Sequence, residues 1–282
     1  MSDRRGAGGL GGGLGGGFPG GMVVGGGGGL IGVIVLLVVL FAGGLGGGSG
    51  GDGIGLAGGN DGDVVEDCRT GADANQSRDC ALVAVVNSVQ EYWSGALDGY
   101  QPAQTVLFRG QVATGCGGAT SAVGPFYCPA DQQIYIDLAF FRDMQRQLGA
   151  SGDFAQAYVI AHEVGHHVQA ELGIAQRVGE VRARAGEAES NALSVRLELQ
   201  ADCFAGVWAR RAHEARGILE RGDIEEGLNA AAAVGDDRLQ RRARGEVVPE
   251  SFTHGSSGQR VRWFRTGLGS GDIRACDTFE TG

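Results

Sequence analysis

Residues 153–172 read DFAQAYVIAHEVGHHVQAEL, the stretch that most strongly constrains the fold. An apolar run precedes the H-E-x-x-H segment within it, and Gly173 follows, as is typical of a buried helix that ends at a glycine. His162 and His166 are four residues apart, so on a helix both imidazoles lie on one face and can bind one metal ion. Glu163 lies beside that face, where it can act as general base toward a metal-bound water. The pattern predicts a helix with two zinc ligands and a base.

A catalytic zinc site needs three protein ligands and one open position. No third histidine follows at the spacing H-E-x-x-H-x-x-G-x-x-H. Glu198 and Asp202 are again four residues apart, on a second predicted helix over 187–215, and apolar residues surround both. We expect Glu198 to complete the zinc site and Asp202 to accept the outer N–H of His162. Glu171, at the end of the first helix, is the competing third ligand.

These motifs and several others resemble a bacterial family, the putative neutral zinc metallopeptidases. The resemblance covers about residues 63–280 and is carried by TGADAN (70–75), SAVGPFYCPADQQIYIDLAFF (121–141), AHEVGHHVQ (161–169), LELQADCFAGVWA (197–209), GDIEEGL (222–228), FTHGSSGQR (252–260) and CDTF (276–279). It implies a membrane-anchored peptidase of the gluzincin kind, with one zinc ion and an E-x-x-x-D helix beside the H-E-x-x-H helix.

A peptidase of this kind usually has a further donor that stabilises the oxyanion. His254 is the candidate, because its polar segment FTHGSS (252–257) matches the family and lies outside any predicted helix. His213, beside Arg210 and Arg211, is the rival. An equally good interpretation is that His254 only holds the tail of the chain in place by hydrogen bonds.

The remaining elements predict an α+β fold: a mainly helical, zincin-like domain with a small β-hairpin or sheet. Phe126–Cys128 and Ile134–Ile136 flank the turn-like residues 129–132, which is typical of a hairpin. A substrate peptide could add as a strand at the edge 132–139. Apolar spacing and turn residues give the other expected segments: helices over 79–94 and 223–234, short β-rich stretches over 103–110 and 122–128, and an irregular tail from Pro249.

The first 62 residues differ in composition from the rest, since they hold 29 of the 55 glycines. No charged residue occurs between Arg5 and Asp52, and the apolar run Leu30–Ala42 lies in this gap. With its uncharged flanks the run predicts a single transmembrane anchor at about 22–45, followed by a flexible tether and a domain over 63–282. A cleaved signal peptide is the alternative. The two arginines near the start predict a cytoplasmic N-terminus and a catalytic domain outside the membrane.

Cysteine usage agrees with that location, because all six cysteines follow the predicted anchor. Six cysteines allow 15 pairings. The equal spacing of the first four favours two local disulfides, which leaves the last two to pair, and a zinc knuckle is disfavoured because no C-x-x-C occurs. The expected pairs are Cys68 with Cys80, Cys116 with Cys128, and Cys203 with Cys276.

A net charge of −10 excludes a typical nucleic-acid binder, which needs a basic face. The sequence therefore predicts a membrane-anchored zinc metalloendopeptidase acting on a peptide or protein substrate. Two alternatives from other classes stay open: a catalytically inactive, zinc-stabilised envelope chaperone or assembly factor, and an amidohydrolase that acts on a non-peptide amide of the cell envelope.

Overall fold

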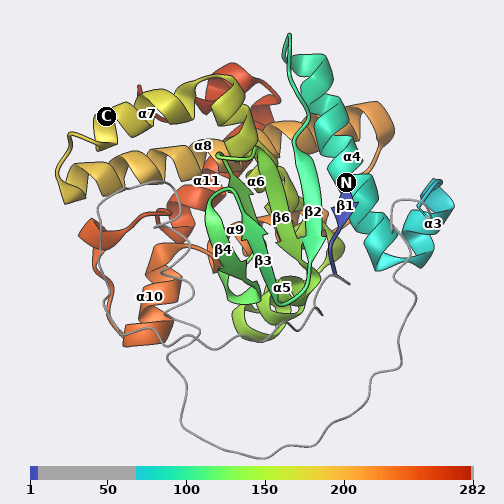
Figure 1. The fold of residues 1–282 in the computed structure, drawn as a ribbon, viewed down its shortest axis with the longest axis horizontal. Helices are drawn as coiled ribbons and strands as arrows, with labels where there is room; N and C mark the ends of the chain where they lie inside the picture. The colour runs from blue at the N-terminus through green and yellow to red at the C-terminus, as the bar shows by residue number, and fades with distance from the viewer. Residues whose placement is uncertain (6–67, 281–282) are drawn as a thin grey trace, which may run out of the picture.

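The helices that carry the H-E-x-x-H and E-x-x-x-D motifs lie behind a small β-sheet (Figure 1). The structure is a computed structural model, and it describes residues 1–5 and 68–280. The predicted anchor at 22–45 and the domain boundary near residue 63 lie outside the described residues. The described part is mainly helical with a small sheet, which confirms the α+β class.

The described elements follow one another along the chain in this order. They are β1 (Ser2–Asp3), α3 (Gly71–Gln76), α4 (Arg78–Ala96), β2 (Gln104–Phe108), β3 (Gln111–Thr114), β4 (Gly117–Thr120), the 3₁₀ turn η1 (Ser121–Val123), β5 (Phe126–Cys128), β6 (Gln133–Asp137), α5 (Leu138–Asp143), the π-helical turn η2 (Met144–Leu148), α6 (Asp153–Glu171), α7 (Ile174–Arg182), α8 (Glu187–Arg216), α9 (Asp223–Ala233), α10 (Asp236–Arg244), η3 (Pro249–Ser251), α11 (Ser257–Ser270) and η4 (Ile273–Cys276).

The main sheet has the strand order β1-β2-β6-β5. β5 pairs antiparallel with β6, which confirms the expected hairpin, whereas β2 runs parallel to β6 on its other side. β3 and β4 form a separate two-stranded sheet. The expectation that residues 132–139 form a free edge was wrong, because β2 and β5 occupy both sides of β6. On the side of the sheet nearest α6, the edge strand is β5.

The long helices agree with the sequence patterns, but the tail does not. α4, α6, α8 and α9 begin and end within two residues of the predicted bounds. The prediction of an irregular tail from Pro249 was wrong, because α11 forms there and packs extensively on α8. Ser256 begins α11 with a capping box to Gln259. Gly267 lets the two helices touch, since a Cβ there would lie 1.9 Å from the carbonyl oxygen of Cys203.

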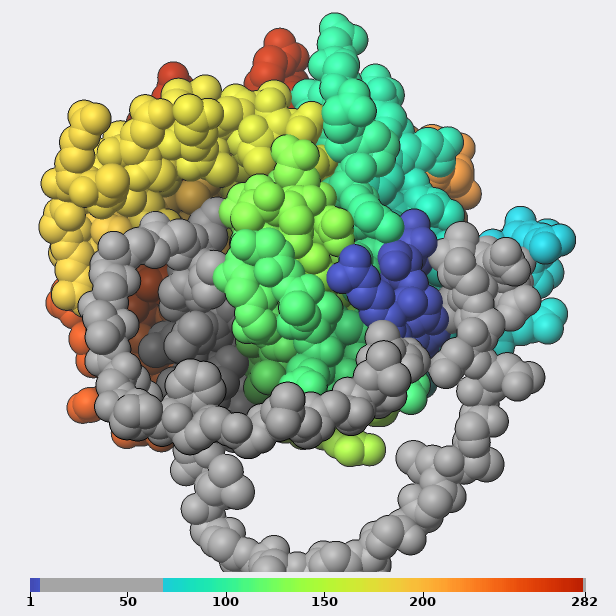
Figure 2. Space-filling model, in the orientation of Figure 1, coloured from blue at the N-terminus to red at the C-terminus, as the bar shows by residue number. Residues whose placement is uncertain are grey.

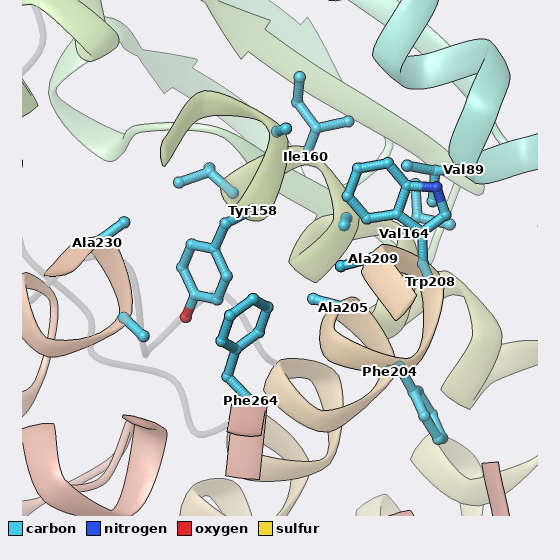
Figure 3. Close-up of a cluster of buried hydrophobic side chains, with 14 of the residues drawn as sticks. Val89, Tyr158, Ile160, Val164, Phe204, Ala205, Trp208, Ala209, Ala230 and Phe264 are labelled. Carbon is cyan, nitrogen blue, oxygen red and sulfur yellow. The ribbon is translucent and has the colours of Figure 1, made fainter. Parts of the chain in front are cut away.

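The core lies where α4, α6, α8, α9 and α11 meet, and Figure 3 shows part of it. Tyr158 of α6 packs edge-on against Phe264 of α11, with ring centroids 5.3 Å apart. Trp208 of α8 is almost fully buried in the same cluster. Burying large aromatic side chains of this kind fixes α6 and α8 relative to each other, and these are the helices that carry the two motifs.

All three expected disulfides are present, and no cysteine is free. Cys68–Cys80 ties the start of the described domain to α4, and Cys116–Cys128 ties the loop between β3 and β4 to β5. Cys203–Cys276 joins α8 to η4 near the end of the chain.

The first five residues lie against the domain, with β1 parallel to β2 at the surface (Figure 2). The Arg5 guanidinium contacts the Asp79 carboxylate of α4 at 2.7 Å. A single membrane pass at 22–45 would separate these residues from the domain, so the pairing disagrees with the expected cytoplasmic N-terminus. Among the described residues, no helix combines the length and the hydropathy needed to cross a membrane.

Candidate metal centre

The two histidines of α6 face each other across one helical turn. Their ring centroids are 4.7 Å apart and the ring planes are nearly perpendicular, at 86°. His162 is only 6% exposed, because α6 has apolar residues around most of its circumference and lies between the sheet and α8. The sequence spacing therefore produces the expected pair of imidazoles on one face, within the core of the protein.

Glu198 of α8 is the carboxylate that reaches this pair. One of its oxygens lies 3.1 Å from Nε2 of His162, and the other lies 3.5 Å from Nε2 of His166. One donor atom from each of the three residues lies within 4.8 Å of the others, a group that could hold a metal ion. The competing candidate, Glu171, instead accepts a hydrogen bond from the backbone N–H of Gln101.

A glycine in the H-E-x-x-H segment allows this close approach of α6 and α8. A Cβ at Gly165 would lie 3.0 Å from the Cα of Ala201, tighter than ordinary side-chain contacts. Ala201 lies between Glu198 and Asp202 in the sequence, so the point of contact is next to the donor carboxylates. A larger residue at position 165 would push apart the two helices that carry the candidate donors.

The donor set fits zinc in its chemistry. Two imidazole nitrogens and one carboxylate oxygen form the three-ligand arrangement of catalytic zinc sites. Burial lowers the pKa of the His162 imidazole, but the carboxylates of Asp202 and Glu198 outweigh that effect and raise it to about 9. Burial raises the pKa of the Glu198 carboxyl, but His166 and His162 outweigh it and hold this pKa well below its usual range. One negative carboxylate and two basic imidazole nitrogens thus lie close together, and each offers a lone pair to a divalent cation.

Asp202 contacts the ring nitrogen of His162 that faces away from Glu198, as the spacing predicted. Its Oδ1 lies 2.9 Å from Nδ1 of His162, and its side chain is fully buried. Arg260 of α11, which the sequence did not single out, donates to both oxygens of the same carboxylate at 2.8 and 2.9 Å. Burial raises the pKa of Asp202, but the Arg260 guanidinium and His162 outweigh it and lower this pKa. Tyr158 also donates to Asp202.

Glu163 lies beside the donor cluster, on the side of the sheet. The backbone N–H of Tyr127 in β5 donates to one of its oxygens at 3.0 Å, and no described residue hydrogen-bonds to the other oxygen. Burial is the largest influence on the Glu163 carboxyl and raises its pKa, although the two histidines oppose the shift. Burial is also the reason that a carboxylate becomes a better proton acceptor near neutral pH.

His254 lies on the wall of the same cavity as the donor cluster. Its Nδ1 is 2.9 Å from Oδ1 of Asp236, and the backbone N–H groups of Thr253, His254 and Gly255 donate to the other oxygen of Asp236. Asp236, the first residue of α10, is buried and was not expected from the sequence. The cavity has a volume of about 100 Å³. It is lined by Val123, Gly124, Pro125, Tyr127, Phe140, Tyr158, Val159, His162, Glu163, His166, Glu198, Val234, His254 and Arg260.

The other two histidines lie outside the cluster. His167 contacts the hydroxyl of Tyr127 through Nδ1 and the carbonyl oxygen of Gln101 through Nε2, at 3.1 and 2.6 Å. These contacts agree with the expectation that His167 packs and forms hydrogen bonds. His213, the rival of His254, is exposed near the end of α8 and accepts the N–H of Leu219.

A family model matches residues 1–279, and its description is "Putative neutral zinc metallopeptidase". The chain belongs to this family. Residues 1–279 include the whole donor cluster, His254 and Arg260, so the match covers every residue of the centre described above. Membership of the family agrees with the resemblance carried by the sequence motifs.

Similar proteins occur in Escherichia coli and in Mycobacterium tuberculosis. The chain is 59% identical over 180 residues to the uncharacterized protein YpfJ of Escherichia coli strain K12, covering 64% of this chain and 62% of that protein. It is 50% identical over 222 residues to the uncharacterized protein Rv2575 of Mycobacterium tuberculosis strain H37Rv, covering 75% and 74%. The matched region thus spans about three-fifths of the Escherichia coli relative. No solved structure matches the chain.

Proposed function

We propose that the protein is a zinc-dependent endopeptidase in which His162, His166 and Glu198 hold the metal and Glu163 is the general base. The observation that carries this proposal is the position of Glu163. Its carboxylate adjoins a three-donor cluster, and both open onto one cavity that His254 also lines. A site with a purely structural role would not need a buried carboxylate with one oxygen left available beside the metal donors.

Zinc bound at this cluster would polarise a substrate carbonyl and make a water molecule more acidic. Glu163 accepts the proton from the attacking water and then passes it to the nitrogen of the leaving amine. The N–H of Tyr127 keeps the carboxylate in place while the proton moves. The raised pKa of Glu163 favours the first transfer, because a carboxylate with a higher pKa is a stronger base.

His254 supports this reaction as the donor to the oxyanion. Its Nδ1 is bound to Asp236, so Nε2 is the ring nitrogen that can serve the cavity. When both nitrogens carry protons, Nε2 donates to the oxyanion and Nδ1 donates to the Asp236 carboxylate. The many hydrogen bonds to Asp236 hold the ring in one orientation.

The cavity walls favour an apolar side chain next to the bond that is cut. Five wall residues are apolar and uncharged: Val123, Pro125, Phe140, Val159 and Val234. Apart from the proposed metal ligands, Glu163 and His254, Arg260 is the one charged residue among the described residues that line the cavity. Its charge is paired with Asp202. A charged substrate side chain would lose its hydration here without gaining a partner. β5, the strand at this edge of the sheet, offers a place for an extended peptide to pair.

Three disulfides favour an oxidising compartment outside the cytoplasm. We propose that the apolar run within 22–45 attaches the protein to the membrane. We further propose that residues 1–5 stay on the domain's side of that membrane, because β1 pairs with β2. The site would then act on peptide segments close to the membrane surface.

The test is the substitution Glu163→Gln in the full chain. This variant should bind about one zinc per chain, like the native protein, but should lose hydrolysis of an unfolded, carboxymethylated protein. The matched control is Glu171→Gln, the same change on the same helix at a carboxylate that accepts from the Gln101 backbone and lies outside the donor cluster, and it should keep full activity.

Three outcomes would contradict the proposal. Proteolysis by Glu163→Gln at the native rate would rule out the base. Zinc binding by the native chain without turnover of any peptide would support the assembly-factor alternative. Cleavage of cell-wall amides but not of peptides would support the amidohydrolase alternative.

A further inference from the structure

Gln169 of α6 is a buried amide whose polar atoms all have partners. It is 1% exposed and lies three residues after His166. Its Oε1 is 2.9 Å from Nδ1 of His166, and its Nε2 donates to the carbonyl oxygen of Leu197 at 2.7 Å. Nε2 also lies 3.2 Å from Oε1 of Gln200. One side chain therefore joins a metal-binding candidate on α6 to the residue that precedes Glu198 on α8.

The orientation of this amide follows from its partners. The Leu197 carbonyl and the Gln200 Oε1 can only accept, so the NH₂ group of Gln169 must face them. Its oxygen must then face His166. Because an amide oxygen only accepts, Nδ1 of His166 must carry a proton and donate. The lone pair needed for a metal is thereby left on Nε2, the nitrogen that faces Glu198.

We propose that Gln169 is a positioning residue for the metal centre. It holds His166 in the form protonated at Nδ1, and through Leu197 it sets the spacing between His166 and Glu198. The proposal rests on the metal site of the proposed function but not on hydrolysis, so it would survive if the protein bound zinc without cutting peptides.

The two imidazoles are thus held by different chemistry. His162 donates to Asp202, a carboxylate that Arg260 neutralises. His166 is held by a neutral amide, and within residues 1–5 and 68–280 no arginine hydrogen-bonds to the Gln169 side chain. Glu163, Glu198 and Asp202 already place three carboxylates around the site against the single guanidinium of Arg260. A fourth carboxylate at position 169 would add a buried negative charge that no arginine neutralises, which explains the fit of glutamine here.

The experiment uses the full chain with zinc as the probe. The substitution Gln169→Leu removes all three hydrogen bonds of this side chain at similar volume and should weaken zinc binding by about 10–100-fold in competition with a chromophoric chelator. Gln169→Glu keeps an acceptor for His166 but loses the donor to Leu197, and it should also weaken binding. The matched control is Gln90→Leu on α4. It removes another buried amide, whose two hydrogen-bond partners are the Ala103 carbonyl and the Tyr100 hydroxyl. That variant should lose stability but keep the zinc affinity of its folded form.

A second readout does not depend on affinity or activity. In the zinc-loaded native chain, NMR with labelled histidine should show the Nδ1–H protons of both His162 and His166 protected from exchange with water. In Gln169→Leu the His166 proton should exchange fast while the His162 proton stays protected, which makes His162 an internal control.

Two results would overturn the proposal. One is a Gln169→Leu variant that is less stable but has native zinc affinity and a protected His166 proton. The other, which needs no variant, is a native chain in which zinc is bound through Nδ1 of His166.

Discussion

Arg260 donates two hydrogen bonds to Asp202, from Nε to Oδ2 at 2.8 Å and from Nη2 to Oδ1 at 2.9 Å. Both side chains are buried, and the guanidinium also lies 3.8 Å from the Glu198 carboxylate. Asp202 in turn holds His162. A cation from α11, far along the chain, therefore supports a contact between α6 and α8.

Removing this cation should destabilise the protein strongly. Arg260→Met would leave the buried Asp202 carboxylate without its partner, and we expect the free energy of unfolding to fall by about 3–5 kcal/mol. Urea unfolding of the metal-free protein measures the effect. Arg265→Met, on the exposed face of the same helix, should change it little. The double variant Arg260→Met with Asp202→Leu should recover part of the loss, and a double variant no better than Arg260→Met would contradict this account.

Zinc binding should release protons below pH 9. Asp202 and Glu198 raise the pKa of His162 to about 9, and Glu198 also raises that of His166, in each case against the effect of burial. At pH 7 the metal-free site therefore carries a proton on His162 that zinc must displace, so affinity should rise with pH, about tenfold per unit for each proton displaced, and level off above pH 9. Calorimetry in two buffers of different ionisation enthalpy counts the protons. Asp202→Asn should release fewer, and a native chain that released none at pH 7 would refute the prediction.

The identity of the third ligand can be tested by two alanine substitutions. Glu198→Ala should abolish most zinc binding, because it removes the carboxylate that reaches both histidines. Glu171→Ala should leave binding unchanged, since that carboxylate contacts the Gln101 backbone instead. Asp202→Ala should cost an intermediate 10–100-fold, as expected for a partner of a ligand. Equilibrium dialysis against zinc distinguishes the three, and loss of zinc in Glu171→Ala alone would contradict the donor set.

Sequence spacing predicted the parts of this centre that are set within one helix. His162, Glu163 and His166 follow from a period of four residues on α6, and Glu198 and Asp202 follow from the same period on α8. The hairpin and the two short-range disulfides also depend on local spacing and were predicted correctly, and the pair Cys203–Cys276 followed because only those two cysteines remained.

The residues missed by the sequence are those whose meaning depends on a distant partner. Arg260 becomes a structural cation only because α11 crosses α8, and that helix was itself missed in a glycine-rich tail. Asp236 and Gln169 are ordinary polar residues until folding places a histidine beside them. Polar residues that repeat at helical spacing usually mark a solvated face, so nothing local distinguishes these three.

The disulfide between Cys203 and Cys276 should matter for the metal site as well as for stability. Its loop of 73 residues is the longest of the three, so replacing both cysteines by serine should cost about 2–5 kcal/mol of unfolding free energy. The Cys276 carbonyl also accepts from Gln200, which contacts Gln169. Zinc affinity should therefore fall in this variant. It should stay native in the matched variant without Cys68–Cys80, and equal affinities in the two would contradict the link.

The position of the N-terminus gives the most direct test of how the chain meets a membrane. β1 pairs with β2, and Arg5 contacts Asp79, so the start of the chain should lie on the same side of the membrane as the metal centre. A short epitope placed before Met1 should be removed by protease added outside intact spheroplasts, as should an epitope after the last residue. An epitope at the cytoplasmic end of an unrelated membrane protein must survive as the control.

Charge reversal at positions 5 and 79 tests the contact between Arg5 and Asp79 directly. Arg5→Asp and Asp79→Arg each place like charges together and should free the first residues for faster trimming by an aminopeptidase, whereas the double variant should restore slow trimming in part, since Arg5 also pairs with Asp3. The pair is partly exposed, so the effect on stability should stay near 0.2–1 kcal/mol and the trimming rate is the sensitive measure. If the N-terminal epitope is protected while the domain is digested, a single pass separates them, and β1 then cannot pair with β2 in the membrane-bound protein.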